Sequence, residues 1–403
     1  IVAAVNGDYW EREYYPDGPY TGRPQGGQVQ SGWFIRRFPE YSGGSGAFYT
    51  IWGVPHIGGD VINGGGAARQ KIIFADSSNA DITALNVERG TDALAIYTPH
   101  WASSTHTDTT GVEVLVRLNR PLLPLPNGTS AFVDGTILQV RDGQGDTPIA
   151  FDQCVVSGTG SGATLLRSKC SIGQTIKFQM IIKDYGFDSR TPVHPPQDWT
   201  KAYGSIGADR EILIDSQITN LPSPDSTRDP RTAVAFNADY VFLIVIDGRS
   251  SYSVGMTFGE LAAFCRDTLS ATHAASLDGG GSSCMWVKGK GIVNRPSDGS
   301  ERATVNGFMM VSVQGKRQSG AFSGGQPVKA WVNTVLRSGP GTDYPLVASI
   351  SVGQEGSVVD HSLNGLSAKG QNWVKWSTGT AEGWTPEYVF YESTRVQEWD
   401  SVE

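Results

Sequence analysis

Hydrophobic periodicity marks a strand–helix–strand unit between residues 241 and 277. Val241–Ile246 is a continuous apolar run, which is typical of a buried strand. In the segment 257–269 apolar residues recur at helical spacing, and Thr257 with Glu260 has the sequence pattern of a capping box. A second short apolar strand ends at Leu277. A unit of this length predicts two parallel strands of one sheet, joined by a right-handed crossover.

Each of these two strands ends on an aspartate followed by glycine. Asp247 begins an Asp-Gly-Arg sequence, and Asp278 is followed by three glycines, 279–281. Parallel strands have their carboxyl ends at one edge of the sheet, so we expect the two aspartates together there. They would start about 5 Å apart on neighbouring strands and about 10 Å apart with one strand between them. Both values lie near the separations that paired carboxylates use in glycoside cleavage. The alternative is that both aspartates cap turns by binding backbone amides.

The rest of the chain has mainly β patterns. Predicted strands alternate with glycine- and proline-rich loops from 1 to about 110, and the pattern at 112–183 is β throughout. We therefore expect an α+β fold with a mixed β-sheet core, a βαβ unit and a β-rich insertion over residues 1–315. A Gly/Ser-rich linker is expected at 316–327, a small C-terminal β-barrel at 328–394 and an acidic tail at 395–403. Trp373, Trp376 and Trp384 would form either a ligand-stacking surface of this barrel or its core.

Several motifs resemble those of a known enzyme family. The sequence Asp278-Gly-Gly-Gly-Ser-Ser, followed by 294–302, resembles the signature of the phosphodiester glycosidases, and 229–235 and 5–10 resemble further motifs of that family in the same order. The likeness covers roughly 1–315. Two departures are Cys284 in place of the family's usual Thr, and Asp209 in a segment that is often glycine-rich. The segment 328–394 resembles a bacterial SH3-type domain, a class that often binds cell wall or partner proteins.

The resemblance implies a site at the sheet edge. Asp247 and Asp278 would be the catalytic carboxylates, and arginines suit an anionic phosphate because a guanidinium binds it in a bidentate way. Each arginine has the structural alternative of pairing with a buried aspartate. No cofactor is required, although Asp8 is a candidate ligand for calcium, a hard cation that prefers oxygen ligands. The expected substrate-binding residues are Asn6, Arg231, Arg249, Gly279, Gly280, Ser282, Asn294 and Arg302.

Composition narrows the partners and the compartment. The formal net charge of −8 and the lack of a Lys/Arg cluster argue against nucleic acid. No apolar run reaches the roughly 18 residues that span a bilayer. The chain starts at Ile1, so we expect that an upstream piece has been lost, and a secretion signal could have been part of it. The four cysteines favour the pairs Cys154–Cys170 and Cys265–Cys284, with four buried thiols as the alternative.

Two functions from different classes follow. The first is a secreted or cell-surface glycosidase that acts on a sugar–phosphate diester or on a related cell-wall or extracellular polysaccharide. The alternative is a non-catalytic glycan- or cell-wall-binding protein with the same fold, in which the SH3-like segment is a second anchor. The two aspartates and three arginines favour the enzyme.

Overall fold

The computed structural model describes fifteen segments of the chain, separated by gaps: 1–11, 23–24, 28–30, 33–36, 46–50, 55–58, 70–118, 125–126, 132–182, 202–219, 221–310, 322–342, 344–361, 364–368 and 371–391. The chain forms two compact units. The first unit comprises 1–71, 123–132 and 179–312, and the second comprises 72–122, 133–178 and 313–403. The expected acidic tail at 395–403 and the first half of the expected linker, 316–321, lie outside the described residues.

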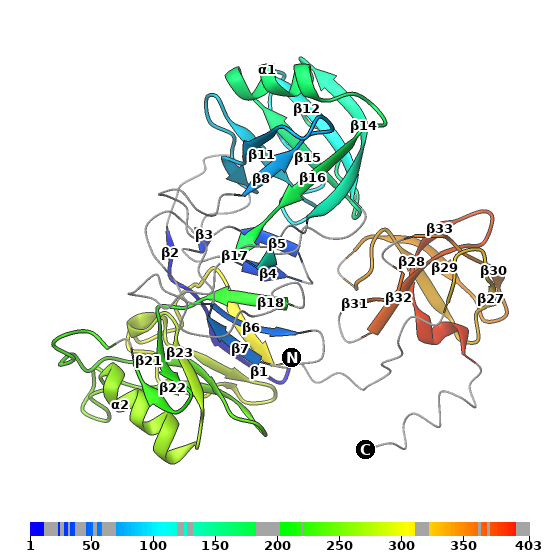
Figure 1. Cartoon of the computed structure of the whole chain (residues 1–403). Coiled ribbons are helices and arrows are strands. Elements are labelled where there is room, and N and C mark those ends of the chain that lie inside the picture. The colour runs from blue at the N-terminus through cyan, green and yellow to red at the C-terminus, as the bar shows by residue number, and fades with distance from the viewer. Residues whose placement is uncertain are drawn as a thin grey trace. The chain divides into compact units, whose positions relative to one another are not determined.

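The first unit is built around a five-stranded sheet with the order β20-β19-β23-β21-β22. Its strands are β19 (Arg210–Ile214), β20 (Gln217–Ile218), β21 (Arg231–Phe236), β22 (Val241–Ile246) and β23 (His273–Ser276). Strands β22 and β23 are both antiparallel to β21 and hence parallel to each other. The helix α2 (Phe258–Ala263) and the π-helical turn Phe264–Thr268 connect them. The predicted βαβ unit is therefore confirmed, with β21 inserted between its two strands (Figure 1).

The helix α2 begins where the sequence predicts it. The Thr257 side chain accepts a hydrogen bond from Glu260 N, and the Glu260 carboxylate accepts one from Thr257 N, which completes the capping box. Phe258, Leu261 and Ala262 pack with Ile212, Ala233 and Ala274 of the sheet. The other sheet face packs against Val5 and Phe308. Because both faces are covered by apolar side chains, the strand ends are held in fixed positions.

Further small sheets complete the first unit. One has the order β25-β24-β1-β26, and another β5-β4-β18-β6-β7; the pairs β2–β3 and β13–β17 stand apart from these. The strands are β1 (Ala3–Asn6), β2 (Trp10–Glu11), β3 (Arg23–Pro24), β4 (Gln28–Gln30), β5 (Trp33–Arg36), β6 (Gly46–Thr50), β7 (Pro55–Gly58), β13 (Leu125–Pro126), β17 (Ile181–Ile182), β18 (Ala202–Gly207), β24 (Met285–Val287), β25 (Gly291–Ile292) and β26 (Gly307–Met310).

The second unit contains an eight-stranded sheet with the order β10-β11-β15-β12-β14-β16-β8-β9. Its strands are β8 (Lys71–Ile73), β9 (Asn79–Asp81), β10 (Ala84–Leu85), β11 (Leu94–Tyr97), β12 (Val112–Leu118), β14 (Val133–Asp142), β15 (Gln153–Gly158) and β16 (Thr175–Gln179). The expectation of β-structure throughout 112–183 was wrong at α1 (Gly160–Lys169). An Asp92 carboxylate oxygen accepts a hydrogen bond from Ser161 N at 2.7 Å, so a residue distant in sequence caps this helix.

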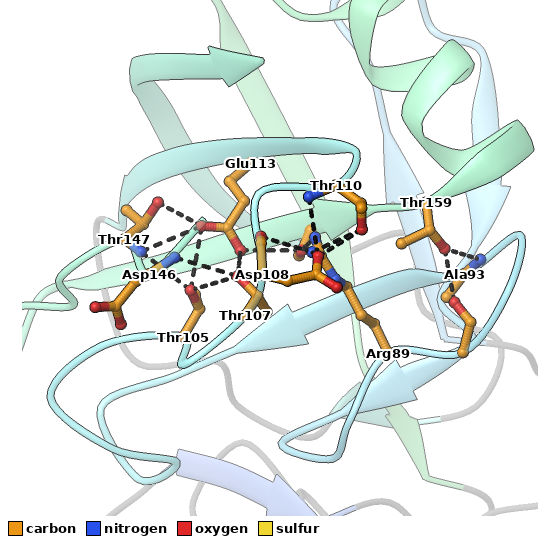
Figure 2. Close-up of polar contacts among 12 residues, drawn as sticks. Arg89, Ala93, Thr105, Thr107, Asp108, Thr110, Glu113, Asp146, Thr147 and Thr159 are labelled. Carbon is orange, nitrogen blue, oxygen red and sulfur yellow. Dashed lines mark hydrogen bonds and ion pairs between the residues drawn. The ribbon is translucent and has the colours of Figure 1, made fainter. Parts of the chain in front are cut away.

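A buried carboxylate organises the threonine-rich loop before β12. Glu113 is fully buried and faces hydroxyl groups on every side. Its Oε1 accepts from Thr107 Oγ1 at 2.7 Å and Ser157 Oγ at 3.0 Å, and its Oε2 accepts from Thr105 Oγ1 at 3.1 Å and Thr147 Oγ1 at 2.5 Å. Figure 2 shows these threonines converging on Glu113. The carboxylate on β12 thus joins two separate loops, those of Thr105 and Thr107 and of Thr147, to strand β15.

The C-terminal part of the second unit forms an antiparallel sheet with the order β27-β30-β32-β33-β28-β29, and β31 pairs with β32. Its elements are β27 (Pro327–Lys329), β28 (Thr334–Arg337), β29 (Leu346–Ile350), β30 (Glu355–Val358), β31 (Leu366–Ala368), β32 (Gln371–Ser377), β33 (Glu382–Pro386) and a 3-10 helix (Glu387–Phe390). Trp373, Trp376 and Trp384 are all at most 3% exposed. Trp376 belongs to the core cluster of this sheet, and Trp384 packs edge-on against the rings of Phe151 and His361, so the three side chains are buried and do not form an exposed stacking surface.

The four cysteines are free thiols, so the expected disulfides were wrong. Each cysteine is buried and packs as a small apolar side chain. Cys265, for example, lies in the core between α2 and the sheet. Burial raises the pKa of Cys265 to about 12 and the pKa values of Cys170 and Cys284 to about 11. Separately, none of the helices in the described residues has the length and apolar character needed to cross a membrane.

Candidate active site at the sheet rim

Four charged residues occupy the sheet edge at which β22 and β23 end, and we call this edge the rim. Asp278 follows β23, and the strand register places it opposite Arg231 of β21. Asp247 follows β22, on the far side of β21. Asp209 precedes β19, on the other side of β23, and its backbone N–H donates to Ser276 O at 2.7 Å. The order across the rim is therefore Asp209, Asp278, Arg231, Asp247.

This order separates the two expected catalytic residues by two strand spacings. Asp247 and Asp278 lie on the same edge, as predicted, but β21 lies between their strands. Their backbones are therefore about 10 Å apart, because neighbouring strands are about 5 Å apart. The strand next to that of Asp278 on the other side is the one that follows Asp209.

Asp278 lies in surroundings that favour its neutral form. Its side chain is only 8% exposed. Burial raises the pKa of Asp278 above its ordinary value, while Ser282, the Arg302 charge and the Gly279 amide oppose the rise and the Asp209 charge adds to it. The backbone of Asp278 is fixed on both sides, since its N–H donates to Gly7 O at 3.0 Å and its carbonyl accepts from Asn6 Nδ2 at 2.7 Å. A fixed carboxyl group with a raised pKa is suited to act as a general acid.

The three glycines after Asp278 each lie against one arginine. A Cβ on Gly279 would lie 3.9 Å from Arg231 Cδ and 2.9 Å from Pro230 O. A Cβ on Gly280, which has φ +60°, would lie 3.0 Å from Arg249 Nη2. A Cβ on Gly281 would lie 2.2 Å from Arg302 Nη2. The glycine run is therefore needed for three reasons: a Cβ on Gly279 would meet the Pro230 carbonyl, Gly280 has a positive φ, and a Cβ on Gly281 would meet the Arg302–Asp298 ion pair.

The three arginines differ in how far the protein occupies their donors. Arg231 is buried; its Nε donates to Met256 O and its Nη2 to Thr227 O, both at 2.9 Å. It stacks on the Phe258 ring at 3.9 Å. Its structural role is therefore to hold the start of β21, with backbone carbonyls as partners instead of the aspartate that the sequence suggested.

Arg249 and Arg302 are more accessible, with side chains 49% and 40% exposed. Arg249 Nε donates to Asp229 Oδ1 at 2.9 Å, and Arg302 forms an ion pair with Asp298. The backbone of Arg249 has φ +54°, a conformation that non-glycine residues seldom adopt and that is concentrated at functional sites. These two guanidinium groups are the ones available to an anionic ligand.

Asp247 and Asn294 hold the loop after β25. Asp247 Oδ1 accepts hydrogen bonds from Arg295 N at 2.9 Å and from Asn294 Nδ2 at 3.3 Å. Asn294 also accepts from Met285 N at 2.8 Å and donates to Ser283 O at 3.0 Å. The protein thus uses both ends of the Asn294 amide. This geometry favours structural roles for both residues.

Asn6 is the last residue of β1, and Asp8 lies in the loop that follows it. The buried Asn6 amide accepts from Thr232 Oγ1 at 2.7 Å and from Cys284 N at 3.1 Å, so it ties the loop to the rim. Asp8 is also buried, and its N–H donates to Asn306 Oδ1 at 2.8 Å. Among the described residues, no group of three or more His, Cys, Asp or Glu side chains is placed to hold a metal ion.

Ser282 and Ser283 are buried in the glycine turn. Within the described part of the chain, neither hydroxyl has a hydrogen-bond partner of good geometry. Ser282 still lies close enough to Asp278 to oppose the rise of its pKa. Both Oγ atoms are shielded from solvent, so these hydroxyls belong to the packing of the turn beneath the rim.

Sequence reasoning did not assign roles to Asp209 and Tyr9. Burial raises the pKa of Tyr9, and the charges of Asp209 and Asp278 add to the rise. Asp209 forms an ion pair with Arg210 at 3.0 Å. The available signal was the unusual carboxylate at 209 in a segment that is often glycine-rich. The position of its strand beside that of Asp278 depends on strand order, which that segment does not reveal.

Comparisons with known proteins agree with a fold of this type. The structure resembles a Burkholderia pseudomallei K96243 protein provisionally described as exported, with 19% identity, a TM-score of 0.51 and coverage of 77% of this chain and 66% of that one. A hypothetical protein from Synechocystis shows 16% identity and a TM-score of 0.46, over 75% of this chain and 50% of that one. The chain therefore spans less than two thirds of the length of either protein.

The other comparisons concern sequence and a more remote structure. The catalytic domain of zebrafish N-acetylglucosamine-1-phosphodiester alpha-N-acetylglucosaminidase, auto-inhibited by its pro-peptide, aligns at 11% identity and a TM-score of 0.21, over 74% of this chain and 81% of that one. No curated protein has a significantly similar sequence. The family model of the phosphodiester glycosidases matches residues 173–311, a shorter stretch than the expected 1–315. The part of the chain that carries most of the rim is thus similar in sequence to the phosphodiester glycosidase family.

Proposed function

We propose that this protein is a secreted glycosidase that cleaves the glycosidic bond of a sugar–phosphate diester or of a related cell-wall or extracellular polysaccharide. The main support is the rim, where the buried Asp278 lies beside a glycine turn that packs against three arginines. The match of residues 173–311 to the phosphodiester glycosidases points to the same reaction class.

The rim residues divide the work of this reaction. Glycosidic cleavage passes through an oxocarbenium-like state and needs an acid at the leaving oxygen. Asp278 supplies the proton, since burial keeps its carboxyl group neutral at higher pH than usual. Arg249 and Arg302 hold the phosphate or another anionic group through guanidinium hydrogen bonds. The glycine turn, the strand ends and the loops are kept in position by Ser282, Asn6, Arg231, Asp247 and Asn294.

Hydrolysis assays test the enzyme directly. Wild-type protein and Asp278→Asn are incubated with a panel of UDP-sugars and aryl glycosides, with and without calcium, and released sugar is measured. We expect turnover by the wild type and a loss of about 100-fold or more in Asp278→Asn, the usual contribution of a general acid. Binding of these compounds without any wild-type turnover would mean that the protein is a glycan-binding protein instead.

Arginine variants test the anionic substrate group. Arg249→Ala and Arg302→Ala should raise KM for UDP-sugars by at least about tenfold and change KM for neutral aryl glycosides little, because only the former carry phosphate. Arg266→Ala is the matched control, since Arg266 is a half-exposed arginine that pairs with Asp267 on the turn after α2. Equal effects on both substrate classes would show that the two arginines do not bind phosphate.

We also propose that the C-terminal sheet is an SH3-like cell-wall anchor. The antiparallel strands around a core of Trp376, Val374 and Phe390 support a small compact module. Because its tryptophans are buried, binding would use other surface residues. Co-sedimentation of the full chain with purified peptidoglycan tests this role. Protein that stays in the supernatant at low and physiological salt would contradict it.

A further inference from the structure

One further arginine at the rim keeps its N–H donors available. Arg295 N donates to Asp247 Oδ1 at 2.9 Å, so the backbone of Arg295 is fixed at the end of β22. Its side chain is exposed, and among the described residues its guanidinium group forms no hydrogen bond or ion pair. By contrast, Arg231, Arg249 and Arg302 each donate to a carbonyl or a carboxylate of the protein. Arg295 is therefore well placed to bind an anion.

An exposed aromatic ring holds the Arg295 side chain. Arg295 Cζ lies over the Tyr252 ring, 3.9 Å from the ring centroid. Tyr252 is 76% exposed, so the ring supports the guanidinium group without burying it. A guanidinium group on an aromatic face is held by cation–π attraction, which leaves its planar fork of N–H donors for a second partner. The stack therefore positions the donors and does not consume them.

The loop that carries Tyr252, between β22 and α2, is itself held at both ends. Ser253 Oγ donates to Asp247 O at 2.5 Å. Near the other end, Met256 N donates to Asp229 O at 3.1 Å, and Met256 O accepts from Asp229 N at 3.2 Å. The ring is thus in place before a ligand arrives, and preorganisation of this kind lowers the entropic cost of binding.

Arg295 lies beyond the arginines that pack on the glycine turn. Arg249 and Arg302 contact the glycines that directly follow Asp278. Arg295 is instead bonded to Asp247, and β21 lies between the strands that end at Asp247 and Asp278. A substrate with its glycosidic bond at Asp278 would therefore reach Arg295 with the outer part of its leaving group.

Resting on the glycosidase function proposed above, we propose that Tyr252 and Arg295 form a second anion subsite, which selects a leaving group with two phosphates over a leaving group with one. Arg249 and Arg302 hold the phosphate on the anomeric oxygen. Arg295 binds the next phosphate through a bidentate pair of N–H···O bonds, and Tyr252 keeps the guanidinium group in position. Because the subsite is remote from the bond that breaks, its loss should raise KM and change kcat little.

Two substrates with the same sugar test the subsite. A UDP-sugar carries two phosphates in its leaving group, and the methyl phosphodiester of the sugar carries one. Arg295→Ala should raise KM for the UDP-sugar at least about tenfold and KM for the methyl phosphodiester less than about twofold, whereas Arg249→Ala should raise both. Equal effects of Arg295→Ala on the two substrates, or none on either, would overturn the subsite and leave the glycosidase intact. The lack of any wild-type turnover would overturn both.

Variants of Tyr252 test the support of the guanidinium group. Tyr252→Ala should raise KM for the UDP-sugar about threefold or more, and Tyr252→Phe, which keeps the ring, should raise it less. Tyr240→Ala is the matched control, since Tyr240 is 65% exposed just before the other end of β22, and it should leave KM unchanged. If Tyr252→Phe were as harmful as Tyr252→Ala, the ring would not be the support of Arg295.

Binding of inorganic pyrophosphate and phosphate, measured by titration calorimetry, tests the subsite without turnover. The wild type should bind pyrophosphate at least about tenfold more tightly than phosphate, because two phosphates reach both sets of arginines. Arg295→Ala should lose most of this preference, and Arg266→Ala should keep it, since Arg266 pairs with Asp267 away from the rim. A preference that survives in Arg295→Ala, or that the wild type lacks, would overturn the subsite whatever the activity.

Discussion

Replacing Asp278 with asparagine should make the protein more stable and inactive. The side chain is 8% exposed, and its burial disfavours the charged form. Asparagine has nearly the same shape and no charge. If Asp278 is a catalytic acid held in an unfavourable place, then its removal should stabilise the fold. If it is a turn cap, then losing hydrogen bonds to its charged form should cost about 1.5–3 kcal/mol.

The effect on stability depends on pH in a direction that follows from the raised pKa. Below the ordinary aspartate pKa near 4, the group is neutral in the folded and unfolded chains, so variant and wild type should be equally stable. As the pH rises, the unfolded chain releases the proton first, and the wild type loses stability until the folded-state pKa is passed. Each pH unit between the two pKa values corresponds to about 1.4 kcal/mol.

Thermal unfolding from pH 4 to pH 8 measures this difference. A gain of about 1 kcal/mol raises Tm by about 2–4 °C for units of this size. Asp247→Asn is the comparison, and it should lower Tm, because Asp247 accepts hydrogen bonds from Arg295 N and Asn294. The reasoning would be refuted if Asp278→Asn were less stable than wild type at pH 7, or if the difference did not change with pH.

Three further predictions concern the glycine turn, the second unit and the thiols. Gly281→Ala should displace the half-exposed Arg302, raise KM for UDP-sugars by at least about tenfold and lower stability by about 1–2 kcal/mol. Gly90→Ala is the control and should have no effect, because a Cβ there would meet nothing within 4 Å. Unchanged kinetics of Gly281→Ala would contradict the packing argument. Glu113→Gln should destabilise the second unit by about 1.5–3 kcal/mol in urea unfolding, because it replaces a charged acceptor of several hydroxyls. Glu88→Gln, at an exposed position, is the control and should change stability by less than about 0.5 kcal/mol. Dithiothreitol should leave Tm unchanged, because the four cysteines are free thiols. Iodoacetamide should react slowly with the folded protein, since all four thiols are buried and their pKa values are raised. A drop in Tm on reduction would reveal a disulfide.

Local sequence patterns predicted the βαβ unit of the first unit's five-stranded sheet. The six apolar residues of β22 and the Thr257–Glu260 capping box are signals contained within single segments. They also placed Asp247 and Asp278 on one edge, because parallel strands must end together. The glycines at 279–281 indicated a turn in which side chains do not fit, and the structure shows one: a Cβ would meet the Pro230 carbonyl at Gly279 and the Arg302–Asp298 ion pair at Gly281, and Gly280 has a positive φ.

Contacts between residues far apart in the chain could not be predicted from these local patterns. The helix α1 was missed because its N-terminus is capped by Asp92, which lies 69 residues away. The sequence left open whether the tryptophans of the C-terminal sheet are exposed or buried, because their burial depends on the strand order. The sequence allowed several disulfide pairings of the four cysteines, whereas in the structure each of them is a buried free thiol.

By itself the sequence indicated the strand, helix and strand of the β22–α2–β23 unit, and it placed an aspartate at the end of each of the two strands. The tertiary structure alone decided which strands are neighbours. It inserted β21 between β22 and β23 and brought β19 to the other side of β23, so that the strand after Asp209, rather than the strand before Asp247, neighbours the strand before Asp278. The physical reason is that the periodicity of a helix or strand lies within one segment of the chain. Strand order depends instead on burying both faces of the sheet at once, and the residues that bury them are far apart in the chain.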